Sequence, residues 1–411
     1  MAKYANSSNQ ILFPFSLQTK NIFDALLKNG DEIRLVGGLV RDFLSDNNID
    51  NADFDLACKY TPEETTRILN QNNIKTIQSG AKYGTITAII DDQQFQITTL
   101  RKDVENFGRD CEVEFHVDFF EDAKRRDFTI NAISIDFAGN VYDYFGGIND
   151  LENKIVCFIG DADSRISEDY LRILRFFRFS CSHAKKIDES GLKACIKHKN
   201  HIQDLSRERV REELFKLFKC KNRENLSSTL QKMFEAGILE LIFNSIDQKK
   251  LNEIKRLFKL EKLLKREFET TLFLAMLIGD KSYHLTLSKN EKKHIEKITK
   301  SKFIANFKIS KKDLLKLMLK FNHKELSDIY LLALALDNDF ENFVDDFLVI
   351  NKMITSSIIP DFPINGNDLI NLGINPRDIG RILKIAKYHW WEKNFLINKQ
   401  GLISFISKKL N

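Results

Sequence analysis

Two neighbouring stretches carry the strongest pattern in this chain: Val36-Gly37-Gly38-Leu39-Val40-Arg41-Asp42 and, shortly after it, Asp53-Phe54-Asp55. In the first stretch an apolar run ends in two glycines, and a helix-like segment that carries Arg41 follows. The second stretch is predicted to be a β-strand, in which alternate side chains share a face, so Asp53 and Asp55 point the same way. Two like charges on one face repel each other unless a cation lies between them.

The two carboxylates are predicted to bind Mg²⁺, which takes oxygen ligands and binds together with substrate phosphates. Gly37 and Gly38 let backbone N–H groups approach a phosphate, and the N-terminus of the following helix favours an anion. Two acids at this spacing also occur by chance in surface turns, but the nearby glycines and Arg41 favour the metal site. The pattern therefore predicts nucleotidyl transfer with Asp53 and Asp55 as catalytic residues.

A second charged cluster is Lys124-Arg125-Arg126-Asp127. Such a run is most often a solvated surface, but this one leads directly into an apolar, strand-like segment. One of its arginines is therefore expected to face the triphosphate or ribose of a nucleotide, and Arg126 is preferred to Arg125. Asp127 and Asn131 are expected to fix the local backbone.

A row of three arginines follows at Arg172, Arg175 and Arg178, on a predicted helix that Ser167 caps. Apolar residues separate these arginines, and arginines embedded in this way usually need an anion or a planar partner. The alternative is ordinary salt bridging on a helix surface. The three arginines, together with Asp169, are predicted to bind the nucleotide.

Asp169 and Arg172 have the chemistry to select the base. The carboxylate accepts a hydrogen bond from the exocyclic amine of cytosine or adenine, and the guanidinium donates to the neighbouring ring nitrogen. Guanine and uracil present a carbonyl and a ring N–H at these places, so both contacts fail, at a cost of about 1–3 kcal/mol for each unpaired group. Arg175 and Arg178 are then expected either to bind the triphosphate or to position the helix.

The chain of 411 residues is long enough for more than one domain, and 63 Lys and Arg against 58 Asp and Glu give a net charge of +5. This mild excess of basic residues permits a nucleic-acid partner. The six cysteines are spread out with no CxxC pair, which indicates reduced thiols in the cytoplasm. The sequence shows neither a signal peptide nor an apolar run long enough for a membrane span.

Local patterns predict a mixed first part and a helical remainder. Thr61-Pro62 is a predicted helix start, Asp91-Asp92 a predicted turn, and residues 101–118 a charged, irregular and mobile loop. From residue 165 to 411 apolar residues recur at helical spacing, with an interruption at 359–363. The other expected elements are an opening helix at 9–29, interrupted early by Pro14 and with a stop at Asn29-Gly30, strands at 33–37, 52–58, 74–77, 84–91, 94–100 and 133–137, and a capped helix start at 205–213 that braces the arginine helix.

In this order the motifs resemble those of the class II tRNA nucleotidyltransferase/poly(A) polymerase family. The motifs that carry the resemblance are Gly37-Gly38-x-x-Arg41-Asp42 with Asp53-x-Asp55, Arg125-Arg126-Asp127-Phe128-Thr129-x-Asn131-Ala132, Asp161 to Arg165, Glu168-Asp169-x-x-Arg172 and Leu205 to Glu213. A weaker match lies at Gly366-Asn367-Asp368-Leu369 to Gly373. The chain departs from the family pattern at Pro376-Arg377-Asp378, where the family commonly has a Gly-Pro pair.

The resemblance implies an α+β fold, with a polymerase β-like mixed-sheet head followed by an all-α neck, body and tail. It implies template-independent addition of CCA to the 3′ end of tRNA from CTP and ATP, with Mg²⁺ and with release of pyrophosphate. The expected domains are a nucleotidyltransferase head at 1–160, a helical neck with the nucleotide-selecting helix at 161–225, a helical body at 226–330 and a tRNA-binding tail at 331–411.

Three alternatives remain open from the sequence. A poly(A) polymerase has the same scaffold, but the Gly-Thr pattern at Gly80-Ala81-Lys82-Tyr83-Gly84-Thr85 favours the tRNA enzyme. A CC-only tRNA nucleotidyltransferase is disfavoured because residues 101–118 occupy the position of the loop that the family uses for the switch to adenosine. A catalytically silent RNA-binding relative is disfavoured by the intact carboxylates and arginines. The oligomeric state and the helical surfaces that contact tRNA are not predicted.

Overall fold

The computed structural model of the protein describes residues 10–27, 32–45, 49, 53–107, 110–115, 117–278 and 283–410. These residues form two compact units. The first lies within Met1–Ile246 and Ser282–Thr286, and the second within Asp247–Lys281 and Leu287–Asn411. The predicted head, neck, body and tail remain a prediction; the boundaries after 160 and 225 fall inside the first unit and the boundary after 330 inside the second.

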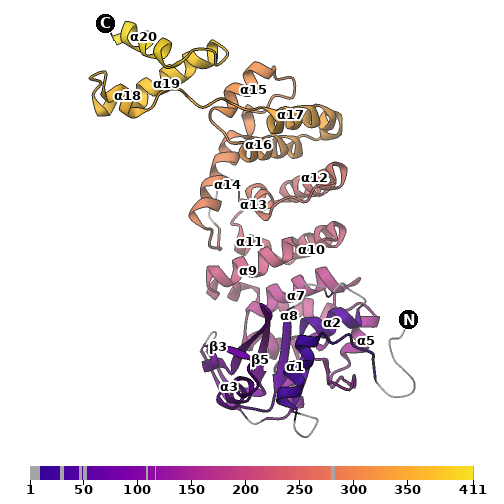
Figure 1. The fold of residues 1–411 in the computed structure, drawn as a ribbon. Helices are drawn as coiled ribbons and strands as arrows, with labels where there is room; N and C mark the ends of the chain where they lie inside the picture. The colour runs from indigo at the N-terminus through magenta and orange to yellow at the C-terminus, as the bar shows by residue number, and fades with distance from the viewer. Residues whose placement is uncertain are drawn as a thin grey trace. The chain divides into compact units, whose positions relative to one another are not determined.

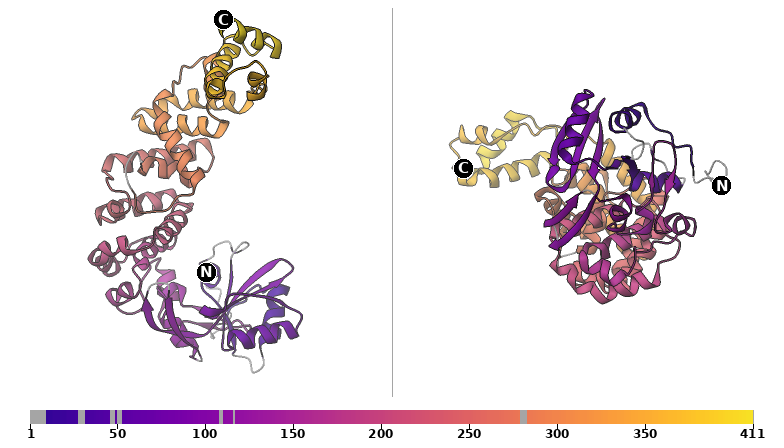
Figure 2. Two further views of the ribbon diagram at one scale, coloured as in Figure 1. Left: turned by 90° about the vertical axis from the view of Figure 1, so that its left-hand side faces the viewer. Right: turned by 90° about the horizontal axis from the view of Figure 1, so that it is seen from below.

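The first unit contains a seven-stranded mixed sheet in the order β3-β4-β5-β2-β1-β8-β9 (Figures 1 and 2). In it β2 pairs antiparallel with β1 and parallel with β5, and Asp55 lies opposite Gln96. The strands are β1 (Ile33–Val36), β2 (Phe54–Cys58), β3 (Lys75–Gly80), β4 (Thr85–Ile90), β5 (Gln93–Thr99), β8 (Ser134–Ile135) and β9 (Val141–Tyr142). The predicted turn is confirmed, because Asp91 and Asp92 have φ of 48° and 63° between β4 and β5.

The two faces of the sheet have different roles. On one face Leu35, Leu56 and Phe95 are buried in the main core, against helices α1 (Leu17–Leu26), α2 (Gly38–Leu44) and α3 (Pro62–Gln71). On the other face Val36, Ala57 and Phe119 form a smaller apolar cluster. Because side chains alternate along β2, Asp53 and Asp55 share the face of Ala57, away from the main core.

Residues 101–118 differ from the irregular loop that their charge predicted. Strands β6 (Arg101–Phe107) and β7 (Asp110–Phe115) form a separate two-stranded antiparallel sheet, with Arg101 opposite Phe115. Both segments are rich in charged residues, and the hydrogen bonds between the two strands stabilise them as a hairpin in spite of their polarity.

The remaining helices of the first unit follow the sheet. Helix α3 starts as predicted, since Thr61 and Glu64 form a capping box and Pro62 occupies the first turn. The opening helix is shorter than predicted, because Ser16 caps α1 after the Pro14 turn; its predicted stop lies outside the described residues. The other helices are α4 (Phe119–Lys124), α5 (Gly147–Glu152), α6 (Ala162–Glu168), α7 (Leu171–His183), α8 (Glu189–His198), α9 (Arg207–Phe218), α10 (Arg223–Glu235) and α11 (Ile238–Ile242), with short 3₁₀ turns at η1 (Ala81–Tyr83), η2 (Thr129–Asn131) and η3 (Lys199–Asp204).

The second unit contains helices and no strand among its described residues, as the periodicity beyond residue 165 predicted (Figures 1 and 2). Residues 357–365, around the predicted interruption, are not helical. None of the described helices is both long and apolar enough to span a membrane. The elements are α12 (Gln248–Leu264), α13 (Thr270–Ile278), α14 (Lys289–Ser301), η4 (Lys302–Ile304), α15 (Lys311–Met318), α16 (His323–Leu336), η5 (Phe340–Phe343), α17 (Val344–Ser356), α18 (Gly366–Ile370), α19 (Pro376–Glu392) and α20 (Lys399–Leu410).

The aromatic run near residue 390 belongs to the core of the second unit. Trp390 is 1% exposed and packs in an apolar cluster with Leu402 of α20. The Trp391 indole N–H donates to the Lys312 carbonyl at 3.1 Å. Both tryptophans are therefore buried inside the second unit.

Candidate active site

The glycine pair lies where β1 turns into α2. Gly37 has φ of 76° and ψ of −140°, a conformation that side chains with a Cβ rarely adopt. A Cβ built on Gly37 would lie 3.3 Å from Asp55 Oδ2 and 3.8 Å from Arg126 Nη1. The turn thus brings together a bare backbone segment, one predicted metal ligand and the preferred arginine of the second motif.

The two acids lie at the start of β2, with Asp53 exposed and Asp55 partly buried. Burial raises the pKa of Asp55; the Arg126 guanidinium lowers it, and the neighbouring Asp53 carboxylate raises it again. On balance the pKa of Asp55 lies above its usual range, which means that the surrounding protein groups stabilise its negative charge less well than water does. This arrangement favours a bound cation.

The donor set fits a hard divalent cation. Both side chains offer carboxylate oxygens, and the described residues contain no cluster of three or more His, Cys, Asp or Glu that could enclose a metal. A site with two protein carboxylates leaves most of the coordination shell to water and to substrate phosphates, which is typical of Mg²⁺ sites in phosphoryl-transfer enzymes.

Arg126 is held by a residue that the sequence analysis did not single out. Asp122 of α4 accepts a hydrogen bond from Arg126 Nη2 at 3.1 Å and from Arg125 Nη2 at 2.8 Å, and its side chain is 4% exposed. Arg126 Nη1 donates to the Asn131 carbonyl at 3.2 Å. Arg125 is thereby turned to Asp122, and Arg126 is the arginine that faces Asp55. An acid three and four residues before two arginines, the spacing of neighbours on a helix, was the signal in the sequence.

Asp127 and Asn131 fix the local backbone, as predicted. Asp127 Oδ1 accepts from the Phe128 N–H at 2.9 Å and from Asn131 Nδ2 at 3.0 Å. Asn131 Oδ1 accepts from Arg41 Nη1 at 2.8 Å. Arg41 is 8% exposed and also bonds Asp42 at 3.0 Å, so its guanidinium joins the glycine turn to the second motif.

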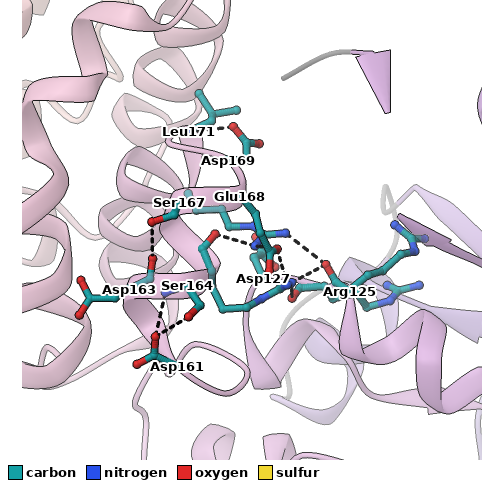
Figure 3. A network of polar contacts seen from close by, with 12 residues as sticks. Arg125, Asp127, Asp161, Asp163, Ser164, Ser167, Glu168, Asp169 and Leu171 are labelled. Atoms are coloured by element: carbon teal, nitrogen blue, oxygen red, sulfur yellow. Dashed lines mark hydrogen bonds and ion pairs between the residues drawn. The ribbon is translucent and has the colours of Figure 1, made fainter. Parts of the chain in front are cut away.

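The predicted helix cap at Ser167 is wrong. Ser167 lies inside α6, where its hydroxyl donates to the Asp163 carbonyl at 2.9 Å, and Asp161 is the residue that caps this helix (Figure 3). The chain is extended at Asp169, and the arginine helix α7 begins only at Leu171. The break places Asp169 just before the helix, where its carboxylate accepts from the Leu171 N–H at 3.1 Å.

Arg172 contacts the segment that carries Arg126. Its guanidinium donates to Glu168 Oε2 at 2.6 Å and to the Arg125 carbonyl at 3.2 Å. Arg165 also donates to Glu168 and to the carbonyls of Arg125 and Arg126. Glu168 and two guanidiniums therefore connect the start of α7 to the arginine pair beside the acids.

Asp169 is held by the predicted bracing helix. Arg209 of α9 donates to Asp169 Oδ2 at 2.7 Å, and Ser206 caps α9 as expected. The side chains of Asp169 and Arg172 thus have separate partners, although the Arg172 N–H bonds the Asp169 carbonyl at 3.0 Å.

Arg175 and Arg178 make ion pairs inside the protein. Arg175 Nε donates to Asp127 Oδ2 at 2.6 Å, and Arg178 Nε donates to Glu213 Oε2 at 2.5 Å. Burial alone would raise the pKa of Asp127, but Arg175 and the hydrogen bond from Asn131 hold it below its usual range. These contacts support the helix-positioning alternative for both arginines, while nucleotide binding by them stays a prediction.

Comparison with known proteins matches the site to two family models. A model described as the poly A polymerase head domain covers residues 33–157, and a model described as a probable RNA and SrmB-binding site of polymerase A covers residues 186–250. The chain is 31% identical to the human mitochondrial CCA tRNA nucleotidyltransferase 1, over 97% of this chain and 94% of that protein. The chain belongs to the family of CCA-adding enzymes.

Other members of the CCA-adding family agree with this assignment. The CCA-adding enzyme of Staphylococcus epidermidis is 32% identical, over 86% of this chain and 88% of that protein. The solved CCA-adding enzyme of Bacillus stearothermophilus in complex with CTP covers 96% of this chain, with 98% of its own length aligned, at 21% identity and a TM-score of 0.71. The Thermotoga maritima enzyme with tRNA aligns over 97% of each chain at 20% identity and a TM-score of 0.65.

These likenesses confirm the predicted family and the predicted α+β class, with its mixed-sheet head followed by helices. The compartment remains open, because the mouse, human and zebrafish relatives are named mitochondrial whereas the staphylococcal relatives carry no such word. The predicted cytoplasmic location therefore stays a prediction. A divalent metal is typical of nucleotidyltransferases of this kind.

Proposed function

We propose that this protein adds CCA to the 3′ end of tRNA, from CTP and ATP and without a nucleic-acid template. The observation that carries the proposal is the joint placement of Asp55, the Gly37 turn and Arg126 on one face of the sheet. Relatives that align along nearly the whole chain are named for this activity, and solved relatives are described in complex with CTP, ATP and tRNA.

In the proposed reaction, the 3′-hydroxyl of the tRNA attacks the α-phosphorus of the nucleotide and pyrophosphate leaves. Asp53 and Asp55 hold Mg²⁺, which when bound lowers the pKa of the attacking hydroxyl and neutralises the triphosphate. The bare backbone at Gly37 and Gly38 leaves room for a phosphate beside the acids. Arg126, kept within reach of Asp55, offers a guanidinium to the triphosphate or the ribose.

Base selection is proposed to come from Asp169 and Arg172. In the structure Arg172 is bonded to Glu168 and Asp169 to Arg209. These partners fix the orientation of the two side chains. Both groups can still bind a base, because a carboxylate has further lone pairs and a guanidinium has further N–H groups. We expect Asp169→Ala and Arg172→Ala to raise incorporation of UTP and GTP relative to CTP and ATP. Unchanged selectivity in both variants would contradict this assignment.

The metal assignment is tested with Asp53→Ala and Asp55→Ala in the full-length protein. We expect each variant to lose at least about 10³-fold in nucleotide incorporation, because a lost metal ligand removes several kcal/mol of transition-state stabilisation. Binding to tRNA, measured by filter retention, should stay within twofold, on the order of the scatter expected when no phosphate contact is removed. Turnover that persists in both variants would show that these acids do not hold the metal.

The lengths of the reaction products distinguish three candidate activities: CCA addition, poly(A) synthesis and CC-only addition. A tRNA that lacks its CCA end is incubated with each nucleotide triphosphate alone and with CTP plus ATP, and the products are sized. Extension by two residues with CTP and by three with both nucleotides supports CCA addition. Long tails from ATP alone would indicate a poly(A) polymerase, and a stop after two residues with both nucleotides a CC-only enzyme.

A further inference from the structure

Two cysteines, Cys181 and Cys220, lie close together near the C-terminal end of the arginine helix α7. Cys181 lies in α7 and is 1% exposed, and Cys220 follows the end of α9 with a partly exposed side chain. The Cys220 thiol donates a hydrogen bond to the Cys181 carbonyl oxygen at 3.7 Å, so the Cys220 sulfur lies against the backbone of Cys181. Asn225 of α10 donates to the same carbonyl at 3.2 Å, so three helices hold the pair in place.

We infer that Cys181 and Cys220 form a modification site at which a hydroperoxide oxidises the two thiols to a disulfide. The site fits this chemistry because one thiol is accessible, the other is buried directly behind it, and both belong to well-packed elements. The bond would join the end of α7 to the turn between α9 and α10. Neither residue takes part in the proposed nucleotidyl transfer.

The electrostatics give the two thiols different roles. The hydrogen bond with Cys181 holds the pKa of Cys220 below its usual range in spite of burial, with further help from the Asn222 backbone, the Ser182 hydroxyl and the charge of Arg223. The same bond, together with burial, raises the pKa of Cys181. Cys220 is therefore the more acidic of the two thiols and, once deprotonated, the nucleophile of the pair, whereas Cys181 keeps its proton more strongly.

The oxidation balances in two steps. The Cys220 thiolate attacks the peroxide, the O–O bond breaks, and Cys220 becomes a sulfenic acid while an alcohol, or water from hydrogen peroxide, is released. The Cys181 sulfur then attacks the Cys220 sulfur, the S–O bond breaks, and the hydroxide leaves as water with the Cys181 proton. The two thiols lose two electrons in total, and the hydroperoxide accepts them.

The test uses the full-length protein, whose other cysteines serve as internal controls. Burial raises the pKa of Cys58 to about 11 and that of Cys157 to about 12, and it also raises the pKa of Cys195. At pH 7 iodoacetamide should therefore label Cys220 at least about tenfold faster than these three. After hydrogen peroxide, peptide mass spectrometry should find the Cys181–Cys220 disulfide, and dithiothreitol should restore both thiols.

A variant separates the two steps. In Cys181→Ser the peroxide should leave Cys220 as a sulfenic acid that dimedone traps, whereas Cys195→Ser should still form the disulfide. Labelling of Cys220 at the rate of Cys58, or peroxide treatment that yields no Cys181–Cys220 bond, would overturn the inference. Because the labelling uses the unmodified protein, misfolding of a variant cannot produce either result.

A second inference concerns Asp122 and rests on the proposed function. We propose that Asp122 is the positioning residue that keeps Arg126 beside Asp55. Its two oxygens divide between the arginines, since Oδ1 accepts from Arg125 and Oδ2 from Arg126. Burial alone would raise the pKa of Asp122, but the two guanidiniums hold it below its usual range, so the residue stays charged and keeps both contacts at neutral pH.

The position of Asp122 explains why one of the two arginines reaches the acids. Helix α4 places Asp122 one turn before the arginines, and its carboxylate bonds Arg125 through Nε at 2.9 Å as well as through Nη2. Arg125 is thus turned to the carboxylate, while Arg126 keeps Nη1 directed to the Asn131 carbonyl and to the Gly37 turn. Without the carboxylate, both side chains would be free to take other rotamers.

The test is Asp122→Asn, with Asp118→Asn as the matched control at the cap of the same helix. Asp118 accepts from the Glu121 N–H, and asparagine caps a helix as well as aspartate does. We expect Asp122→Asn to raise KM for CTP and ATP by about tenfold and to lower kcat, since a charge-assisted hydrogen bond to Arg126 is lost. Asp122→Glu should recover part of the loss, and Asp118→Asn should behave as the wild type.

Thermal unfolding and CTP binding are measured on the same preparations. A lower melting temperature of Asp122→Asn with unchanged KM and kcat would show a purely structural role and overturn this second inference. Absence of incorporation and of CTP binding in the wild type would instead refute the proposed function, and the role of Asp122 would fall with it.

Discussion

At the scale of single residues, His183 shows how burial controls a titratable group in this fold. It ends α7, and burial, followed by the charges of Arg41 and Arg178, lowers its pKa to about 3. Its Nε2 lies 4.0 Å from Asp42 Oδ1, but that carboxylate is already bonded to Arg41. Burial and the two arginines therefore keep the imidazole neutral.

This residue makes stability depend on pH. An unfolded histidine has a pKa of about 6.5, so between pH 6.5 and 3 the unfolded chain binds a proton that the folded protein rejects. The stabilisation is complete above pH 6.5 and is lost as the pH falls towards 3. From pH 7.5 to 5.0 we expect the wild type to lose about 2 kcal/mol more stability than His183→Gln.

Urea unfolding at both pH values measures this difference. His323→Gln serves as a control, because that side chain is exposed at the start of α16. An equal loss in the wild type and in His183→Gln would contradict the assignment of a neutral, buried imidazole.

At the scale of elements, the contact between α7 and α9 orders the arginine helix. Glu213 of α9 has a side chain that is 4% exposed, and it lies 2.5 Å from Arg178 and 3.7 Å from Arg175. A second contact joins Arg209 to Asp169 at the start of the helix. The two helices are thus held at two points, and the predicted bracing role of the segment at 205–213 is confirmed.

Removing the Glu213 charge should loosen this contact. We expect Glu213→Gln to destabilise the protein by about 2–3 kcal/mol, because Arg178 would keep its charge in a largely buried place without a charged partner. The neighbouring Glu212 is exposed, and Glu212→Gln should change stability by less than about 0.5 kcal/mol. Thermal unfolding of both variants tests this prediction, and equal melting temperatures for the two variants would contradict a stabilising role of the Glu213 charge.

At the scale of the whole molecule, the proposed nucleotide ligands all belong to the first unit. Asp53, Arg126 and Arg172 lie within Met1–Ile246, whereas the second unit consists of helices among its described residues. Many of the exposed side chains in that second unit are lysines, which suits contact with a phosphate backbone. Nucleotide binding is thus expected to be confined to the first unit, separate from the RNA contact of the second unit. Residues 186–250 of the first unit, which match the RNA-binding model, are expected to contact RNA as well.

Hydrogen exchange tests this separation. We expect CTP with Mg²⁺ to slow amide exchange at residues 33–58, 119–131 and 165–183, because a bound ligand reduces local opening. Exchange at residues 366–410 should not change without tRNA. Protection confined to the second unit would contradict the placement of the nucleotide site.

Local signals in the sequence predicted much of the fold. The capping box at Thr61, the turn at Asp91-Asp92, the alternation that puts Asp53 and Asp55 on one face and the helices beyond residue 165 depend on neighbours a few residues apart. The same local reasoning failed at Ser167, because a serine followed by acids resembles a cap wherever it occurs. It also failed at residues 101–118, where the many charged residues suggested an irregular loop although the segment forms a β-hairpin.

By itself, the amino-acid sequence determined the family and most of the helices and strands, and it predicted the residues proposed to carry the chemistry, since periodicity, capping and motif spacing are properties of short segments. Only the tertiary structure decided which residues of different elements meet: Arg126 with the Gly37 turn, Asp169 with Arg209, and Cys220 with Cys181. The physical reason is that an ion pair or a thiol contact between different elements depends on how those elements pack, and it leaves no periodic pattern along the chain.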